Sequence, residues 1–328
     1  MLPISVLVPT RNSMSLLPKH LESMRAWRDL VVEIVAVDSH SNDGTLELLQ
    51  RELNQPRDRV LTHPPGLYQS WNFGIAQCEA RYIYVSTVGE TITRAGLEAL
   101  FTAAESSRAD VVISPPRMVK MSGEAKEKVW PIHALIDELK LNASVVFDRE
   151  AARLFAVINL TRGLLGSSAS NLYRADVLQR FPFRTDFGTA GDLAWGLEHA
   201  GEVRLALVPE MFSTFVFHPK SYAKSDYAVN DFNEKCLALA RASVARGGEA
   251  TPPAKTAALL DELFSAWEGW LHTKRRVTEA KRSAMWCLKP GAWQAHLDRA
   301  AAARALAARQ HHAMLELAAR LAQAAPRQ

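Results

Sequence analysis

The sequence has little cysteine and no long apolar run. Its 328 residues include three cysteines, Cys78, Cys236 and Cys287, none with a close neighbour along the chain. That spacing argues against a disulfide framework or a cysteine zinc site and fits a reducing, cytoplasmic compartment. No stretch of about 18 apolar residues occurs, so we expect no transmembrane helix. The apolar start, residues 1–9, lacks a basic segment and a cleavage site, so we expect no signal peptide.

The sequence also lacks a strong charge excess. It has 39 Lys and Arg against 35 Asp and Glu, a net charge of +4, and 48% of its residues are hydrophobic. This excess is too small to require a nucleic-acid partner, and the composition predicts a globular protein with a sizeable core. Residues 251–328 are more basic, with 12 Lys and Arg against 6 Asp and Glu. This segment is either a solvated helical face or a surface for anions.

Short apolar runs alternate with helical patterns over the first 115 residues. Buried strands are expected at residues 4–8, 34–37, 60–61, 82–85 and 111–113. The alternation predicts an α/β fold with a doubly wound, mostly parallel sheet. Ligands of such sheets bind beyond the carboxyl ends of the strands. The candidate site is therefore formed by three polar loops, Pro9–Asn12, Asp38–Asp43 and Ser86–Glu90.

The chain is less regular over residues 115–165 and becomes helical from about Asp231. Gly166–Ser170 and Phe187–Asp192 are loops rich in small residues. The last 38 residues contain 15 alanines, a bias that favours ordered helix over a disordered linker. We therefore expect one domain over residues 1–228 and a helical C-terminal subdomain over residues 229–328.

Three carboxylates and one histidine in these loops are candidates for chemistry. Asp38 could accept hydrogen bonds from a base or ribose, and Glu90 could bind a divalent cation that bridges phosphates. Asp192 could act as a general base. His218 could bind a metal or a phosphate. Each has a structural alternative: a turn or cap for Asp38, a surface residue in a turn before a helix for Glu90, a helix N-cap for Asp192 and a structural role for His218. Asp43-Gly44-Thr45 in the loop after Asp38 is expected to be a turn and a helix cap.

Four segments, taken in order, resemble the glycosyltransferases of family 2, which have the GT-A fold. Ile4–Asn12 is similar to the opening strand and turn of that family, and Val35–Thr45 is similar to its second loop. Gly66–Ile75 resembles the family's Gly-Ile-Tyr-Asp-Ala-Met-Asn-Lys-Gly-Ile. Tyr82–Glu90 falls where the family has a strand and an acidic metal motif. Each segment is weak evidence alone, and the ordered set is strong.

The resemblance implies an inverting glycosyltransferase with a nucleotide-sugar donor, a UDP-sugar being favoured. The acceptor would be a glycan or a lipid-linked molecule, as in bacterial surface polysaccharide synthesis. By this resemblance Asp192, followed by Trp195, matches the catalytic base, and Glu90 and His218 match the metal-binding positions. The donor-binding positions would be Pro9, Thr10, Arg11, Asn12, Asp38, Asn72, Thr87 and Gly89.

The sequence departs from the family pattern at three positions. Thr87 and Gly89 stand where many members have Asp, and Gly191 replaces the Glu before the base. A Mg²⁺ or Mn²⁺ ion held by Glu90, His218 and the donor phosphates is one expectation. The other is that side chains stabilise the leaving diphosphate without a metal. The cations available for that are Arg11, Lys220 and Lys224.

The weakened metal motif leaves a second hypothesis, a non-catalytic relative that binds nucleotide or glycan beside a partner enzyme. The pair of Asp192 and Trp195 favours an enzyme, because a dead relative need not keep this carboxylate. The expected location is cytoplasmic. The basic stretch Trp267–Trp293 leaves open a peripheral contact with the inner face of the membrane. A homodimer through the C-terminal helices is also open.

Overall fold

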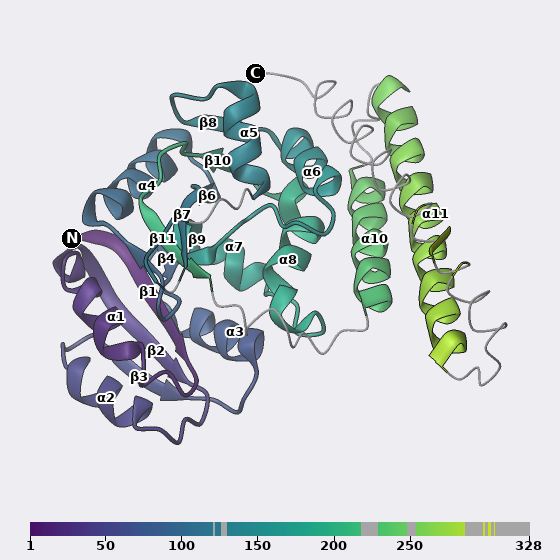
Figure 1. The fold of residues 1–328 in the computed structure, drawn as a ribbon. Helices are drawn as coiled ribbons and strands as arrows, with labels where there is room; N and C mark the ends of the chain where they lie inside the picture. Colours follow the sequence, from purple (N-terminus) through teal and green to yellow (C-terminus); the bar gives the residue numbers. More distant parts are fainter. Residues whose placement is uncertain are drawn as a thin grey trace. The chain divides into compact units, whose positions relative to one another are not determined.

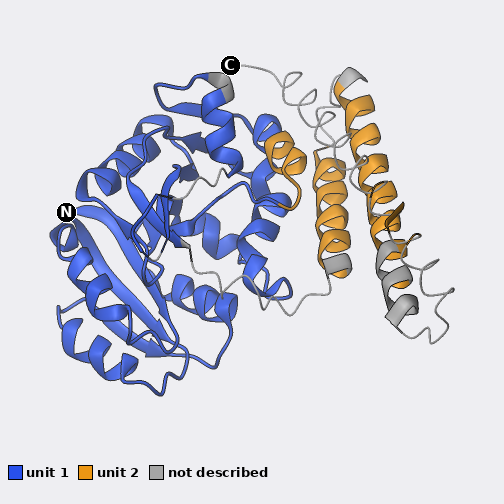
Figure 2. Cartoon of the chain, in the orientation of Figure 1, with its two compact units in different colours: residues 1–152, 162–226 blue, residues 153–161, 227–328 orange. Residues whose placement is uncertain are grey.

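The chain forms two compact units in the computed structural model (Figure 2). The structure describes residues 1–120, 122–125, 130–217, 229–247 and 254–285, together with residues 298, 301, 302 and 305. The first unit comprises Met1–Ala152 and Arg162–Asp226, and the second comprises Arg153–Thr161 and Tyr227–Gln328.

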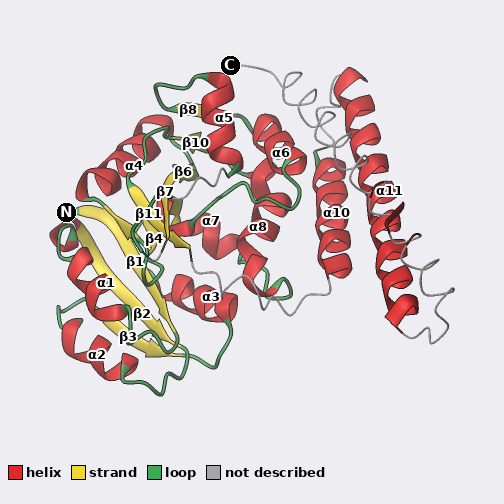
Figure 3. Cartoon of the chain, viewed as in Figure 1, coloured by secondary structure: helices red, strands yellow, loops and turns green. Residues whose placement is uncertain are grey.

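An eight-stranded sheet is the centre of the first unit, in the order β3-β2-β1-β4-β9-β6-β10-β8 (Figures 1 and 3). Its strands are β1 (Leu2–Thr10), β2 (Val31–Asp38), β3 (Arg59–Thr62), β4 (Tyr82–Val85), β6 (Val111–Ile113), β8 (Val145–Phe147), β9 (Asn171–Arg174) and β10 (Leu205–Leu207). The strands pair in parallel, except that β9 is antiparallel to β4 and β6 and β8 is antiparallel to β10. A second sheet joins β5 (Thr91–Ile92), β11 (Ser213–Phe217) and β7 (Pro116–Lys120).

Helices cover both faces of the large sheet (Figure 1). The α-helices are α1 (Leu17–Met24), α2 (Thr45–Glu52), α3 (Leu67–Gln77), α4 (Arg94–Ser107), α5 (Pro131–Leu139), α6 (Arg149–Ile158), α7 (Ala175–Arg180) and α8 (Gly191–His199). Short 3₁₀ turns are η1 (Arg28–Leu30), η2 (Ser168–Ser170), η3 (Gly188–Ala190) and η4 (Ala200–Glu202). Ile4, Val6 and Val8 share one core with α1, α2 and α4. Leu7 points to the other face and contacts α3, where a Cβ on Gly74 would lie 2.3 Å from Leu7 Cδ1. Only a glycine lets α3 approach the sheet this closely.

The register of the sheet brings the candidate loops to one edge. Thr10 at the end of β1 lies opposite Asp38 at the end of β2. Val85 at the end of β4 lies opposite Leu7, on the other side of β1. Because these three strands are parallel, the loops that follow them all open at the carboxyl edge of the sheet.

The second unit contains residues 153–158 of α6 and a helical pair, α10 (Val229–Arg246) and α11 (Ala254–Met285). Arg241 pairs with Glu268 across the two helices at 2.7 Å. Trp267 and Trp270 are buried, and their rings meet edge to face at 5.0 Å. Within the described ranges, the helices are all too short or too polar to cross a bilayer.

The expected fold class is confirmed, since the sheet is doubly wound and mostly parallel and helices follow it. Within residues 115–165 the sequence predicts a short helix at Pro131–Leu141, which α5 confirms, whereas β7, β8 and α6 were not expected. β7 and β8 are only five and three residues long, too short to give a clear alternation of apolar and polar residues. The Trp293 end of the basic stretch lies outside the described residues.

Candidate active site

The loops after β1 and β2 are tied to each other. The Asn12 N–H donates to Ser41 Oγ at 2.8 Å, and the Asn42 N–H donates to Asn12 Oδ1 at 3.0 Å. Asn12 has a φ of 47°, a left-handed conformation that asparagine adopts more readily than most residues. The predicted turn at residues 9–12 is therefore a fixed polar rim, and Arg11 is exposed on it.

Asp38 is the buried anchor of this rim. Its Oδ1 accepts hydrogen bonds from Thr10 Oγ1 at 3.1 Å and Ser41 Oγ at 2.5 Å. Its Oδ2 accepts from the Ser41 N–H at 2.8 Å. The residue is 0% exposed, so its carboxylate orders the two loops in this structure. Its contact with a nucleobase stays a prediction.

Asp43 makes the second tie between these loops. Its Oδ1 accepts from Thr45 Oγ1 at 2.6 Å and from the Thr45 N–H at 3.1 Å, at the start of α2. Its Oδ2 accepts from the Met14 N–H at 3.0 Å. The hydrogen bond from the Thr45 side chain is the main reason why the pKa of Asp43 lies below its ordinary value. As the sequence predicted, Asp43-Gly44-Thr45 is a turn that satisfies a free N–H of the helix.

The polar loop after β4 is a tight turn that ends at Glu90. The Glu90 N–H donates to the Thr87 carbonyl at 3.0 Å. Gly89 has a φ of 94°, which a type II turn requires at its third position. The glycine that replaces an acid of the family motif therefore has a backbone role here.

Glu90 is a partly buried carboxyl group inside the first unit, and not the surface residue of the structural alternative. Burial raises its pKa to about 8, the hydrogen bond from Ser167 Oγ opposes the shift, and the charge of Asp192 adds to it. Glu90 is therefore mainly protonated at neutral pH. The Ser167 hydroxyl comes from the small-residue loop before β9, 77 residues further along the chain.

Asp192 lies in the first turn of α8, close enough to Glu90 for their charges to interact. Ala190 is the N-cap residue, so Asp192 is inside the helix and the N-cap alternative is wrong. Its Oδ1 accepts a hydrogen bond from the Leu193 N–H at 2.8 Å. Burial raises the pKa of Asp192, while the Leu193 N–H and the nearby Tyr68 hydroxyl oppose the shift.

Gly191, beside the candidate base, packs directly against Tyr68. A Cβ at this position would lie 2.4 Å from the Arg184 carbonyl oxygen and 2.5 Å from Tyr68 Cδ2. Its φ is −65°, so the backbone conformation does not require glycine. Space requires it, and the family's Glu cannot stand here while Tyr68 occupies this position.

Asn72 connects α3 to the segment that precedes α8. Its Nδ2 donates to the Phe183 carbonyl at 2.8 Å, and its Oδ1 accepts from the Phe183 N–H at 2.9 Å. The Phe183 ring packs on Tyr68 and on Trp195. The Asn72 carboxamide thus holds the backbone at Phe183 against α3, and its contact with the donor stays a prediction.

Sequence reasoning missed three residues at this site, Tyr68, Ser167 and His20. His20 is buried in α1, and its Nε2 lies 3.1 Å from Ser86 Oγ, at the start of the loop that carries Glu90. Burial lowers its pKa to about 4, so the imidazole is neutral. The helical spacing with Leu17 and Leu21 was a signal that this histidine faces the core.

The described side chains do not form a metal site by themselves. No group of three His, Cys, Asp or Glu residues within them is arranged to hold an ion. Glu90 is one carboxylate, mainly protonated, and Ser167 donates to it. The other predicted ligand, His218, lies outside the described residues, as do Lys220 and Lys224.

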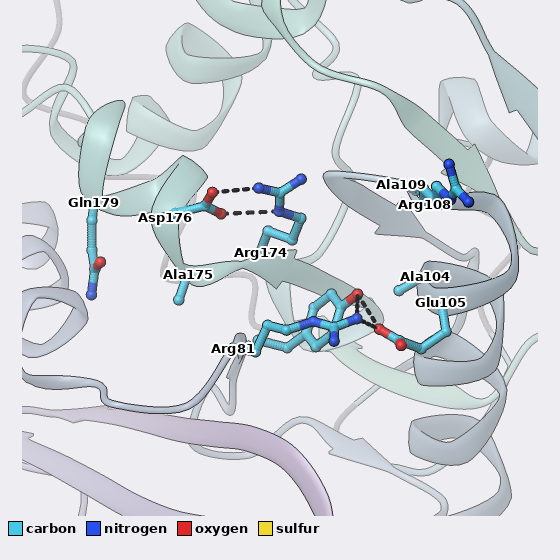
Figure 4. Close-up of a pocket in the computed structure, with 10 residues that line it drawn as sticks. Arg81, Ala104, Glu105, Arg108, Ala109, Arg174, Ala175, Asp176 and Gln179 are labelled. Atoms are coloured by element: carbon cyan, nitrogen blue, oxygen red, sulfur yellow. Dashed lines mark hydrogen bonds and ion pairs between the residues drawn. The ribbon is translucent and has the colours of Figure 1, made fainter.

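A cavity of about 570 Å³ opens at the opposite edge of the sheet (Figure 4). Tyr82 begins β4 and Arg174 ends the antiparallel β9, so the cavity is remote from the carboxyl ends of the parallel strands. Four of its charged groups form ion pairs, Arg81 with Glu105 and Arg174 with Asp176, and Arg108 also lines it (Figure 4). It takes no part in the site around Asp192.

Comparisons with known proteins agree with the fold. Residues 5–158 match the family model described as glycosyl transferase family 2. No curated protein matches the chain. Among solved structures, S. aureus TarS 1-349 in complex with UDP-GlcNAc has a TM-score of 0.59 at 16% identity, over 98% of this chain and 91% of that chain.

Two further TarS structures are similar. TarS 1-349 in complex with UDP has a TM-score of 0.55 at 17% identity, over 74% of this chain and 65% of that chain. S. aureus TarS has a TM-score of 0.55 at 16% identity, over 81% of this chain and 43% of that chain. This chain thus spans less than half of the TarS chain. The expected GT-A-type fold is confirmed.

Proposed function

Through residues 5–158 the chain belongs to glycosyltransferase family 2, and we propose that this glycosyltransferase inverts the anomeric carbon of a nucleotide-sugar donor. The favoured donor is a UDP-sugar, because two similar structures are complexes with UDP and UDP-GlcNAc. The proposed acceptor is a glycan or a lipid-linked molecule of bacterial surface polysaccharide synthesis. The cytoplasmic location, the peripheral membrane contact and the homodimer stay predictions.

The observation that carries the proposal is the position of the Asp192 carboxylate. Inverting transfer needs a base that takes the proton of the acceptor hydroxyl while its oxygen bonds to the anomeric carbon. The bond from that carbon to the donor phosphate breaks in the same step. Asp192 is partly exposed, lies close enough to Glu90 for their charges to interact, and keeps acceptor capacity beyond its hydrogen bond from the Leu193 N–H.

The donor is proposed to bind on the rim formed by the loops after β1, β2 and β4. Thr10 is buried beneath this rim, whereas Arg11 and Asn12 are exposed and Thr87 and Gly89 are partly exposed. The tied loops present this surface in one fixed shape before the donor arrives, which lowers the entropy lost on binding.

The leaving nucleoside diphosphate needs compensating positive charge. Family 2 enzymes commonly use a divalent cation, and we propose Mg²⁺ or Mn²⁺ held by Glu90, His218 and the donor phosphates. The exposed guanidinium of Arg11 is the alternative source of charge. If the donor still binds in the presence of EDTA, Arg11 is favoured as the source of charge, and if binding is lost, the metal ion is favoured.

The test is a calorimetric screen of UDP-, GDP-, dTDP- and CMP-sugars with Mg²⁺, with Mn²⁺ and with EDTA. We expect one donor to bind the wild type and Asp192→Asn equally. We expect the variant to lose at least a hundredfold in donor hydrolysis or transfer, the scale of general base catalysis. A variant that keeps its full rate would remove Asp192 from the mechanism.

The absence of two motif acids, at Thr87 and Gly89, favours a second candidate, a non-catalytic relative that binds nucleotide or glycan. This candidate predicts donor or glycan binding without hydrolysis or transfer under any metal condition. The same screen decides between the two, provided that it is repeated with oligosaccharide acceptors present.

A further inference from the structure

We propose that the indole ring of Trp130 binds a pyranose unit of the glycan acceptor, beside the turn that carries Glu90. The inference rests on the proposed function, because it takes the ligand to be the acceptor of sugar transfer. Trp130 is the N-cap residue of α5, within a stretch of the chain where the sequence predicted no site residue.

The indole ring lies close to a side chain of the candidate active site. A Cβ on Gly166 would lie 3.0 Å from Trp130 Cε3 and 3.3 Å from Cζ3, so the ring packs on the Gly166 backbone. The φ of Gly166 is 62°, so its backbone conformation also favours glycine. The next residue, Ser167, donates a hydrogen bond to the Glu90 carboxyl group. The ring is therefore at the border of the turn that carries Glu90.

The order of the strands separates Trp130 from the donor rim. The segments that contact Trp130 and its helix are Gly166, which precedes β9, and Pro116, which follows β6. In the sheet β4 lies between β1 and β9, so the Glu90 turn has the loops after β1 and β2 on one side and Trp130 on the other. Inverting transfer needs the acceptor hydroxyl on the side of the anomeric carbon opposite the leaving phosphate. Trp130 is placed for the acceptor and not for the nucleotide.

The surroundings hold the ring in one orientation. Phe215 on β11 meets it edge to face, with 4.9 Å between the ring centres. The Trp130 N–H donates to His133 Nδ1 at 3.2 Å, so the imidazole proton is on Nε2, which donates to the Pro116 carbonyl at 3.0 Å. Pro131 at the start of α5 restricts the backbone next to Trp130. A ring held in this way loses little conformational entropy when a ligand binds.

The chemistry of the surface fits a sugar ring. Trp130 and Phe215 are both partly exposed. A hexopyranose carries hydroxyls around its edge, whereas its axial C–H groups form an apolar face that packs on a flat aromatic ring. An indole thus binds the sugar through its face and leaves the hydroxyls at its edge for transfer.

The test compares Trp130→Leu and Trp130→Phe with the matched control Phe101→Leu. Phe101 is a partly buried aromatic residue of α4 whose ring meets Tyr82 at the opposite edge of the sheet. Leucine keeps apolar volume at position 130 and removes the flat ring, so we expect the KM for the acceptor to rise about tenfold. The kcat and the donor affinity measured by calorimetry should stay within about twofold. Trp130→Phe should recover most of the acceptor affinity, and the control should behave as wild type. An unchanged KM for the acceptor in Trp130→Leu, or an equal loss of donor affinity, would refute the inference.

A measurement without catalysis separates this inference from the proposed function. The protein labelled with 5-fluorotryptophan is titrated with cellotetraose, chitotetraose and maltotetraose and followed by ¹⁹F NMR, with Trp130→Phe and Trp27→Phe assigning two signals. We expect one of these glycans to shift the Trp130 signal and to leave that of Trp27, a core residue 1% exposed, in place. If no glycan moves the Trp130 signal, or if both signals move together, the inference is overturned even for an active enzyme. If wild type transfers no sugar and the Trp130 signal still moves, the proposed transfer fails and the glycan contact stands.

Discussion

Adding a single methyl group to Gly191 should disturb both the fold and the candidate base. In Gly191→Ala the new Cβ would lie 2.4 Å from the Arg184 carbonyl oxygen and 2.5 and 2.6 Å from two Tyr68 ring carbons. Ordinary contacts between non-bonded carbons are about 3.5–4.0 Å. The ring and the carbonyl must therefore yield by about 1 Å, and overpacking of this kind typically costs about 1–3 kcal/mol.

The helix propensity of alanine opposes this steric cost, so the measured change in stability is the sum of the two effects. Gly191 has helical dihedrals, φ −65° and ψ −29°, and alanine is about 1 kcal/mol more favourable than glycine inside a helix. Gly196 on the same helix is the control, because its Cβ would meet Leu164 Cβ at 3.4 Å, an ordinary contact. We expect Gly196→Ala to be neutral or to stabilise by up to about 1 kcal/mol.

The assay is urea unfolding followed by circular dichroism, together with the initial rate of sugar transfer. Gly191→Ala should be less stable than Gly196→Ala, and its rate should fall about a hundredfold, because a displacement of about 1 Å at a reacting group has that effect. If Gly191→Ala is as stable and as active as Gly196→Ala, the contact between Tyr68 and Gly191 does not exist as described.

Two further predictions concern buried carboxylates. In Asp38→Asn only one oxygen remains to accept the hydrogen bonds from Thr10 and Ser41. The loss of about one hydrogen bond to a charged group should lower the donor affinity, measured by calorimetry, about tenfold. Arg59→Ala leaves Glu33 buried without its ion-pair partner and should lower the free energy of unfolding by about 3 kcal/mol at pH 7 in urea titrations. Burial acts to raise the pKa of Glu33, but its hydrogen bonds outweigh burial and hold the pKa below the ordinary 4.5. The stabilisation from the charged carboxylate is therefore lost as pH falls below about 4.5. We expect the free energy of unfolding to fall less over this pH range in Arg59→Ala than in the wild type.

The parts of the fold that the sequence predicted well are those decided locally. Tyr82–Val85 and Val111–Ile113 are strands with the expected bounds, because a buried parallel strand is a continuous apolar run. β9 was not expected as a strand. Asn171–Arg174 mixes polar and apolar residues, and it becomes a strand by antiparallel pairing with β4 and β6, which are distant in the sequence.

The same limit applies to the site. Asp38, Glu90 and Asp192 could be selected because each is a carboxylate in a loop or at a helix start that follows a regular element. Their neighbours could not, because Ser167 reaches Glu90 across 77 residues and the Tyr68 ring packs on Gly191, beside Asp192, from another helix. Sequence spacing contains no information on such pairs until the fold brings them together.

The structure also changes the meaning of the departures from the family motif. Gly191 looks like the loss of a functional acid, yet it leaves the space that the Tyr68 ring occupies. Thr87 and Gly89 remove two acids, and the acid that remains, Glu90, is mainly protonated at neutral pH. The turn after β4 is therefore close to neutral, whereas a turn with several aspartates would repel a diphosphate unless a cation intervened. A metal that used Glu90 would have to displace its proton, so its affinity would rise as pH approaches about 8. The departures thus weaken the electrostatic need for a metal at the same turn where they remove its ligands.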